Sequence, residues 1–298
     1  MAKPLVIINK DINRDLMLRS GKIYVIDAEV HVAKGIKLTA EDQTTILISN
    51  GVKPKSKIRR SALIFDQGSI LKAKRLTIKA ASEECKPIKH ADNGGIWFMG
   101  NFQDAAKDGL SVKVNRKNPF SSFNASTITT HYLGRHDSYT NKKSGKNINI
   151  GDDIDGISIL GVGKDEWEVK RIRSLYSADD GLDVTNSHVK FDRIEIINPT
   201  EDGLNLSSSR VEVHKSLIID VSKNDKADRE IFDFEVDDGS SFFEIFRNCA
   251  IDIKGCFGDE VVLSSIDLPK KNNNPAARYK FKGASKKRSS LVYSIRID

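Results

Sequence analysis

Apolar and polar residues alternate over short runs along most of the chain. The clearest examples are Leu182 and Val184, Val189 and Phe191, and Ile194 and Ile196. This period of two predicts β-strands, because successive side chains of a strand point to opposite faces. β-Branched residues dominate these runs and Gly recurs between them, which disfavours a helix. We therefore expect an all-β chain.

The segment 179–220 contains the same pattern twice. Residues 180–184, DGLDV, align with residues 202–206, DGLNL, at an offset of 22, and residues 189–191 align with 211–213 at the same offset. A repeat of this length predicts a coil with one turn per repeat, in which each strand pairs in parallel with its counterpart one turn on. The predicted fold is a right-handed parallel β-helix, a solenoid with an N-terminal cap.

Stacking of the repeats predicts which apolar side chains share a column of the core. One inward column is expected to contain Leu182, Leu204 and Phe234. A second is expected to contain Ile197, Ile219 and Ile251. The additional residues of the later repeats are assigned to the polar segments 222–230 and 237–241, because surface loops tolerate insertion.

The whole chain, 1–298, is interpreted as one elongated domain. Residues 1–60 are expected to form the cap and the first turns, because the open end of a solenoid exposes core and strand edges. The alternation fades in residues 101–149, which we expect to form a long surface excursion. The clearest repeats lie in 150–268, and 269–298 is a basic C-terminal end.

Two stretches carry a resemblance to a known class of proteins. DGLDVTNSHVKFDRIEIIN, from Asp180, and DGLNLSSSRVEVHKSLIID, from Asp202, resemble the parallel β-helix repeats of the pectin lyase-like superfamily. The resemblance implies the fold and a protein directed at polysaccharides. Because this architecture hosts lyases, hydrolases, phage tailspikes and non-catalytic binders, the reaction stays open.

Acidic residues recur at two positions of the repeat. The outward position inside the Asp-Gly strand is assigned to Ser158, Asp183, Asn205 and Glu235. The turn position just before this strand is assigned to Asp155, Asp180, Asp202 and, in the last recognisable turn, Asp259. Asp before Gly is ordinary turn chemistry.

The same stacking also gives these carboxyls a spacing that suits catalysis. Strand spacing places Asp180 and Asp202 about 5 Å apart, and Asp183 and Glu235 about 10 Å apart. Carboxyl pairs about 5 to 5.5 Å apart suit a retaining glycosidase, and pairs roughly 6.5 to 9.5 Å apart suit an inverting one. Asp180, Asp183, Asp202 and Glu235 are therefore the candidate catalytic residues.

Two enzyme families of this superfamily sharpen the alternatives. Asp179-Asp180-Gly181 is similar to the paired aspartates of polygalacturonases, although the accompanying GHG and NTDG motifs are absent from the sequence. Resemblance to pectate lyases would imply a Ca²⁺ carboxylate cluster with an arginine base, for which Arg193 or Arg247 is a candidate. Stacked carboxylates are also suitable Ca²⁺ ligands in their own right, because this ion takes six to eight oxygens. No other cofactor is expected.

A basic residue recurs four positions into each repeat. The residues are Arg171, Arg193, Lys215 and Arg247, which we expect to form one exposed line. Such a line has two interpretations: it binds an anionic polymer, or it stabilises the turns together with local carboxylates such as Asp192 and Glu195. His188 and His214 fall in different columns and are expected to be separate, solvated side chains.

Charge is unevenly distributed along the chain. The net charge is +7, yet residues 150–268 hold 13 Lys and Arg against 27 Asp and Glu, so this segment carries −14 and the rest +21. The expected partner is an extended polysaccharide or another anionic polymer. The basic ends also admit nucleic acid as a less favoured partner, which strong salt dependence of binding would support.

Other sequence features exclude several classes of protein. No segment combines a basic region, an apolar run and a cleavage site, and none is long and apolar enough for a membrane span. The three Cys residues, Cys85, Cys249 and Cys256, make neither a disulfide framework nor a zinc motif. We expect a chain that is cytoplasmic as synthesised, with a virion or export without a signal peptide as alternatives. Two functions stay open: a polysaccharide hydrolase or lyase, and a non-catalytic binding or structural β-helix.

Overall fold

The computed structural model is built of β-strands, and the residues that it describes contain no helix. These residues are 3–50, 61–89, 93–101, 119–135, 138–140, 147–149, 155–221, 230–235, 241–246, 249–255, 261–262, 278–280 and 290–291. The backbone alone is described for 138–140, 147–149, 235, 261–262, 278–280 and 290–291. The expected all-β class is confirmed for this part of the chain.

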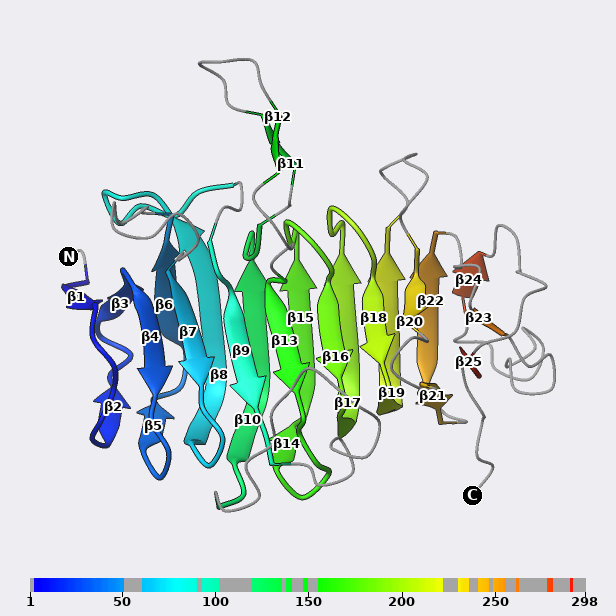
Figure 1. Cartoon of the computed structure of the whole chain (residues 1–298), viewed down its shortest axis with the longest axis horizontal. Coiled ribbons are helices and arrows are strands. Elements are labelled where there is room, and N and C mark those ends of the chain that lie inside the picture. Colours follow the sequence, from blue (N-terminus) through cyan, green and yellow to red (C-terminus); the bar gives the residue numbers. More distant parts are fainter. Residues whose placement is uncertain are drawn as a thin grey trace.

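One sheet has seven short strands that follow one another in chain order. The strands are β4 (Glu29–Val32), β7 (Ala62–Phe65), β9 (Ile96–Met99), β13 (Ile157–Leu160), β16 (Leu182–Thr185), β18 (Leu204–Ser207) and β20 (Phe232–Glu235). All of the pairs in this sheet are parallel. Figure 1 shows its strands side by side along the long axis of the molecule.

The second sheet has sixteen strands, again all parallel. The strands are β1 (Leu5–Ile8), β2 (Leu16–Leu18), β3 (Ile23–Ile26), β5 (Lys37–Ala40), β6 (Thr44–Ser49), β8 (Ile70–Ala81), β10 (Ser122–His131), β14 (Trp167–Val169), β15 (Arg171–Leu175), β17 (His188–Ile197), β19 (Arg210–Asp220), β21 (Phe242–Ile245), β22 (Ala250–Lys254), β23 (Val261–Val262), β24 (Arg278–Lys280) and β25 (Ser290–Leu291). Three long strands each pair with two short ones on one side: β8 with β5 and β6, β10 with β14 and β15, and β19 with β21 and β22. The long strands β8 and β10 also pair with each other, as do β17 and β19.

From β4 to β22 the chain alternates between the two sheets. We call one pass through both sheets a repeat. The hairpin of β11 (Ser138–Thr140) and β12 (Asn147–Asn149) is an antiparallel insertion into this order, and Figure 1 shows it projecting away from the strands of both sheets. The described structure is therefore a regular stack of parallel strands with one inserted hairpin.

The core lies between the sheets and is built from columns of apolar side chains. The offset of 22 is confirmed where Leu182 pairs with Leu204, but Leu204 then pairs with Phe232, so the prediction of Phe234 in this column is wrong. Phe234 instead pairs with Leu206. The polar segment after β19 lengthens this repeat to 28 residues, a length that the apolar pattern alone does not determine.

A bulge in β19 changes the second predicted column. Asp192 in β17 lies opposite two residues, His214 and Lys215, and the register moves by one from this point. Ile219 consequently pairs with Ile196 and Ile253, whereas the predicted partner Ile197 pairs with Asp220. Ile251, the other predicted member, pairs with Leu217. Ile219 is buried as expected, but with other neighbours.

Residues 101–149 are not wholly a surface excursion, which corrects the expectation. β10 pairs with β8 on one side and with β14 and β15 on the other, and buries Phe123, Ala125 and Ile128 between the sheets. The outward positions of β10 carry Ser, Thr and Asn, residues that are also common in loops. This composition hid the strand from the sequence analysis. Residues 102–118 lie outside the described part of the chain.

Candidate acidic site on the seven-stranded sheet

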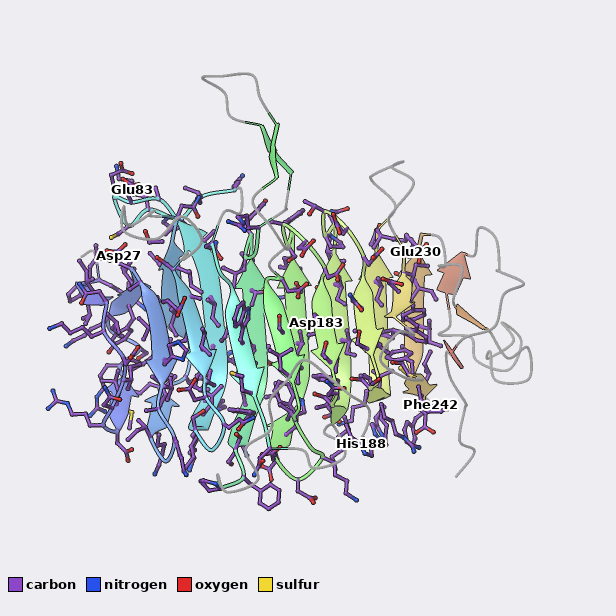
Figure 2. All side chains as sticks on the ribbon, in the orientation of Figure 1. Asp27, Glu83, Asp183, His188, Glu230 and Phe242 are labelled. Carbon is purple, nitrogen blue, oxygen red and sulfur yellow. The ribbon has the colours of Figure 1, made fainter. Side chains whose placement is uncertain are left out.

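The outer face of the seven-stranded sheet carries a line of one aromatic and four polar side chains. Pairing places Trp97, Ser158, Asp183, Asn205 and Asp233 at equivalent positions of five neighbouring strands. The alternate positions of each strand are buried in the core, so this line points outward. Figure 2 shows Asp183 near the middle of the sheet. We call these five residues the outer line.

The register corrects one predicted member of this line. Glu235 pairs with Ser207, and the position next to Asn205 belongs to Asp233. The same lengthened repeat that moved Phe234 also moved Glu235 by two residues. The side chain of Glu235 lies outside the described residues.

Aspartates that precede the Gly residues link successive repeats. Oδ1 of Asp180 accepts a hydrogen bond from the Asp202 N–H at 2.9 Å, and Oδ1 of Asp202 accepts one from the Glu230 N–H at 2.6 Å. Asp180 and Asp202 therefore share a column, as predicted, with Glu230 as the next member. Asp259, predicted for this column, lies outside the described residues.

Gly181 allows this close approach of neighbouring repeats. A Cβ atom at this position would lie 2.2 Å from Cγ2 of Ile196 and 2.5 Å from the carbonyl oxygen of Gly203. The glycine N–H in turn donates a hydrogen bond to the Asp202 carbonyl at 2.8 Å. Any larger residue would push the aspartate column away from the next repeat.

Several carboxyls of this site are buried, although the predicted line faces outward. Asp180 and Asp183 are only 7% and 8% exposed. Burial raises the pKa of Asp180 to about 8. Burial and the charge of Asp180 raise the pKa of Asp202 to about 9, and burial with three neighbouring aspartates raises the pKa of Asp155 well above its usual range. These shifts favour the protonated forms of Asp155, Asp180 and Asp202 near neutral pH.

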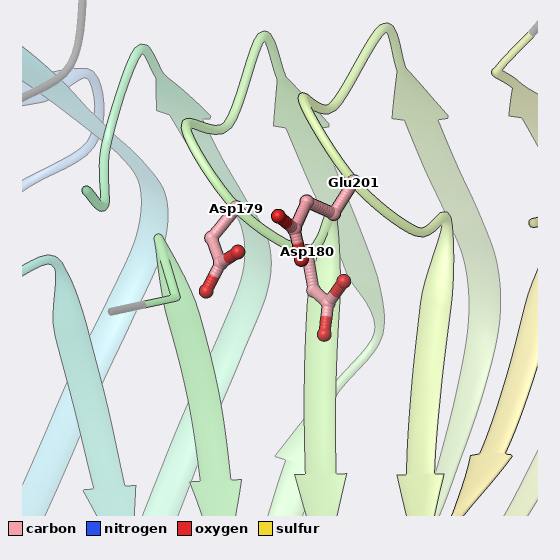
Figure 3. A group of neighbouring side chains, drawn as sticks. All are labelled: Asp179, Asp180 and Glu201. Carbon is pink, nitrogen blue, oxygen red and sulfur yellow. The ribbon is translucent and has the colours of Figure 1, made fainter. Parts of the chain in front are cut away.

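Three carboxylates converge at the start of β16. One oxygen each from Asp179, Asp180 and Glu201 lies within 4.8 Å of the others. Figure 3 shows Asp179 and Asp180 on the segment that leads into β16, with Glu201 reaching toward them from the equivalent segment of the next repeat. Among the described residues, this group matches the carboxylate cluster that the sequence suggested for Ca²⁺. Glu201 was not among the residues predicted for it.

The predicted basic line is interrupted. Arg171 pairs with Arg193, but Arg193 pairs with Ser216, because Lys215 lies in the bulge of β19. Arg247 lies outside the described residues.

Several cations on the sixteen-stranded sheet are paired with local carboxylates. Arg171 and Arg173 both bind Glu195, at 2.5 and 2.8 Å. Lys215 Nζ lies 2.7 Å from Asp192. Arg210 is paired with Glu244 at 2.7 Å, and Lys254 with Asp220 at 3.2 Å. This geometry matches the interpretation in which the basic residues stabilise the repeats.

Glu212 connects the two histidines that the sequence placed apart. His188 Nε2 lies 3.1 Å from one carboxylate oxygen of Glu212, and His214 Nε2 lies 3.5 Å from the other. Burial opposes ionisation of Glu212, but the hydrogen bond and charge of His188 and the charges of Arg210 and His214 lower its pKa. Sequence spacing missed this cluster because the contact joins neighbouring repeats.

A groove lies beside this cluster, at the bulge of β19. Its volume is about 440 Å³, and its lining residues are Trp167, Glu168, Val169, Lys170, Lys190, Phe191, Asp192 and His214. These residues belong to the sixteen-stranded sheet and its connections, whereas the outer line belongs to the seven-stranded sheet. The groove is therefore separate from the acidic site.

Glu166 is a further buried carboxylate that sequence reasoning missed. It accepts hydrogen bonds from the backbone N–H groups of Asn101 at 3.0 Å, Ser121 at 2.7 Å and Gly163 at 2.9 Å. Burial raises its pKa, while these three hydrogen bonds oppose the rise. Glu166 thus links three chain segments: the segment that follows β9, the start of β10 and the connection between β13 and β14.

Comparisons of the chain with protein-family models, curated proteins and solved structures found no match. In the part of the chain that the structure describes, no helix has the length and apolar character to cross a membrane. Functional assignment therefore starts from the geometry of the acidic site.

Proposed function

We propose that this chain is a right-handed parallel β-helix of the pectin lyase-like kind that binds an extended polysaccharide along its seven-stranded sheet. The alternation of the chain between two parallel sheets supports the fold. The outer line, one side chain from each of five neighbouring strands, is the observation that carries the function. Adjacent strands are about 4.8 Å apart, so a polymer lying along the stack passes one of these positions at each step. Trp97, Asn205 and Asp233 are partly exposed there, whereas Ser158 and Asp183 are buried.

The chemistry of the outer line suits a carbohydrate. The indole of Trp97 offers an apolar face, and the partly exposed Asn205 and Asp233 offer amide and carboxyl groups for hydrogen bonds to sugar hydroxyls. Binding sites of this kind combine an aromatic surface with a few placed polar groups. This combination distinguishes the outer line from a charged face that only confers solubility.

The acidic site extends this proposal to hydrolysis. A glycosidase needs one protonated carboxyl to donate a proton to the leaving oxygen and one carboxylate to activate water or attack the sugar. Asp180 or Asp202, with a pKa raised to about 8 or about 9, serves as the acid. Asp183, close enough to raise the pKa of Asp180 by its charge, serves as the carboxylate.

A lyase fits the described geometry less well. That reaction needs a strong base. Of the two arginines considered for it, Arg193 lies on the sixteen-stranded sheet and Arg247 lies outside the described residues. Asp180 and Asp183 lie at the seven-stranded sheet. We therefore favour hydrolysis over elimination.

A non-catalytic binding or structural β-helix, such as a virion appendage or scaffold, is the second candidate. One observation favours it: the carboxyls of Asp180 and Asp202 both hold an N–H of the following repeat. Residues with this role stabilise the stack whether or not a reaction takes place. Both candidates bind a polysaccharide, but only the hydrolase cleaves it.

Incubation with neutral and acidic polysaccharides, assayed for new reducing ends and for unsaturated products, separates the candidates. We expect reducing ends to appear without unsaturated products. Asp183→Asn should lower their rate of formation by about 100-fold or more, the contribution of a general acid or base. Asp192→Asn, on the other sheet, is the matched control and should retain the rate.

Bound polymer with unchanged chain length would favour the structural candidate. Equal rates for the wild type and Asp183→Asn would remove Asp183 from the catalytic pair. Absence of binding to every polysaccharide would contradict the proposal as a whole.

A further inference from the structure

Two tyrosines form an aromatic stack at the ends of neighbouring strands. The rings of Tyr132, which follows β10, and Tyr176, which follows β15, lie 4.8 Å apart between centroids at an interplanar angle of 9°. Tyr132 is partly buried against the core, whereas Tyr176 is 38% exposed. An exposed tyrosine ring that is held against a second ring is a rigid apolar surface. Because the ring is already fixed, it loses little conformational entropy when a ligand binds.

The backbone holds both rings in place. The Tyr132 N–H donates to the Leu175 carbonyl at 2.9 Å, and the Tyr176 N–H donates to the Ile197 carbonyl at 2.8 Å. Both residues have left-handed backbone conformations, with φ of 56° and 60°. Asn198 occupies the equivalent position of the next repeat with φ of 48°, and its N–H donates to the Asp220 carbonyl. Asparagine adopts this conformation readily and tyrosine does not, so the tyrosines are not required by the turn itself.

The tyrosine stack lies close along the chain to the acidic site. From Tyr176 the chain passes through Ser177 and Ala178 directly to Asp179. The Ala178 N–H donates to the Leu133 carbonyl at 2.9 Å, which ties this segment to the residue that follows Tyr132. The exposed ring and the carboxyls at the start of β16 therefore belong to one short connection between β15 and β16.

Charge selects among the polymers that such a ring can bind. Residues 150–268 carry a net charge of −14, and the cluster of Asp179, Asp180 and Glu201 begins three residues after Tyr176 in the chain. Five of the described cations, Arg171, Arg173, Arg210, Lys215 and Lys254, are paired with carboxylates on the sixteen-stranded sheet. A polyanion would be repelled at this site, whereas an uncharged chain with hydroxyl groups would not.

We infer that the Tyr132 and Tyr176 stack is a subsite for a ring of a neutral polysaccharide, with the Tyr176 ring as the contact surface. The inference rests on the proposed function and narrows its ligand from polysaccharides in general to uncharged ones. The apolar C–H face of a sugar packs on the aromatic ring, while the sugar hydroxyls remain available to the acidic site. The position of Tyr176 in the chain makes this contact flank the carboxyls.

Titration calorimetry with cellohexaose, xylohexaose and maltohexaose, and with hexagalacturonate as the anionic probe, tests the inference. Tyr176→Asn removes the ring and installs the residue that the next repeat carries at this position, so the fold is retained. We expect it to weaken binding of the preferred neutral oligosaccharide by about tenfold, the loss that removal of one aromatic contact produces. Tyr176→Phe keeps the ring and should bind within about twofold of the wild type.

Phe242→Ala is the matched control, because it removes another exposed aromatic ring, from β21 of the sixteen-stranded sheet. It should leave the affinity unchanged. Equal affinity of Tyr176→Asn and the wild type, or preference for hexagalacturonate, would overturn the inference and leave the proposed function standing. A wild-type protein that binds none of the four probes and no polysaccharide of the wider panel would overturn both.

Discussion

Phe98→Ala lowers the free energy of unfolding by about 3 to 5 kcal/mol, the range for removal of a buried aromatic side chain. The Phe98 ring is fully buried and stacks on Phe65 at 5.2 Å between centroids. It also meets the ring edges of Phe123 at 5.1 Å and Trp167 at 5.4 Å. These contacts join the seven-stranded sheet to the sixteen-stranded sheet. The hydrogen-bonded strands on either side prevent collapse of the cavity, so urea unfolding should show most of the loss.

Phe242→Ala is the control for this measurement. The Phe242 side chain is 42% exposed on β21, so its removal should change the free energy of unfolding by less than about 1 kcal/mol. A similar loss for both variants would mean that the aromatic residues between the sheets are not the core. A loss below about 1 kcal/mol for Phe98→Ala would have the same meaning.

The stacked parallel strands could be predicted from the sequence because two repeats keep the same length. Leu182 with Leu204, and Val189 with Val211, pair at the offset of 22 that the sequence shows. Prediction fails where one residue is added inside a strand. In β19 both Ile218 and Ile219 are apolar, so the alternation does not reveal which of them faces the core after the bulge.

The acidic site was predicted in part. The column of Asp180 and Asp202 follows from the repeat, but burial of these groups depends on the path of the connections, which periodicity does not describe. Asp233 was missed because the sequence does not show how long the lengthened repeat is. Asp233 and Glu235 are both acidic and two residues apart, so either could occupy the position next to Asn205.

The tyrosine stack was missed for a different reason. Tyr132 and Tyr176 are 44 residues apart, twice the repeat, yet they lie in neighbouring repeats, because the β11 and β12 hairpin is inserted between them. Only the pairing of β10 with β15 identifies the contact.

The protonated carboxyls predict a stability that falls as pH rises through neutrality. Burial raises the pKa of Asp180 to about 8 and that of Asp202 to about 9, from 3.8 in the unfolded chain. Above pH 4 the unfolded chain has released both protons, while the folded protein keeps them. The stabilising contribution is therefore complete below pH 4 and is lost as pH rises through the folded pKa values. Each such group lowers the free energy of unfolding by on the order of 1 kcal/mol per pH unit in this window.

Urea unfolding between pH 5.5 and pH 9 should show this fall in the wild type and a flatter profile in the Asp180→Asn, Asp202→Asn double variant. Asparagine keeps an Oδ1 that accepts the N–H of the following repeat, so the stack is preserved while the titrating group is removed. Histidine titration is common to both proteins and cancels in the difference. Asp192→Asn, which removes a carboxylate on the other sheet, should keep the wild-type profile. Parallel profiles for the wild type and the double variant would show that both aspartates are ionised when folded, and the proposed hydrolase would then have no acid at this site.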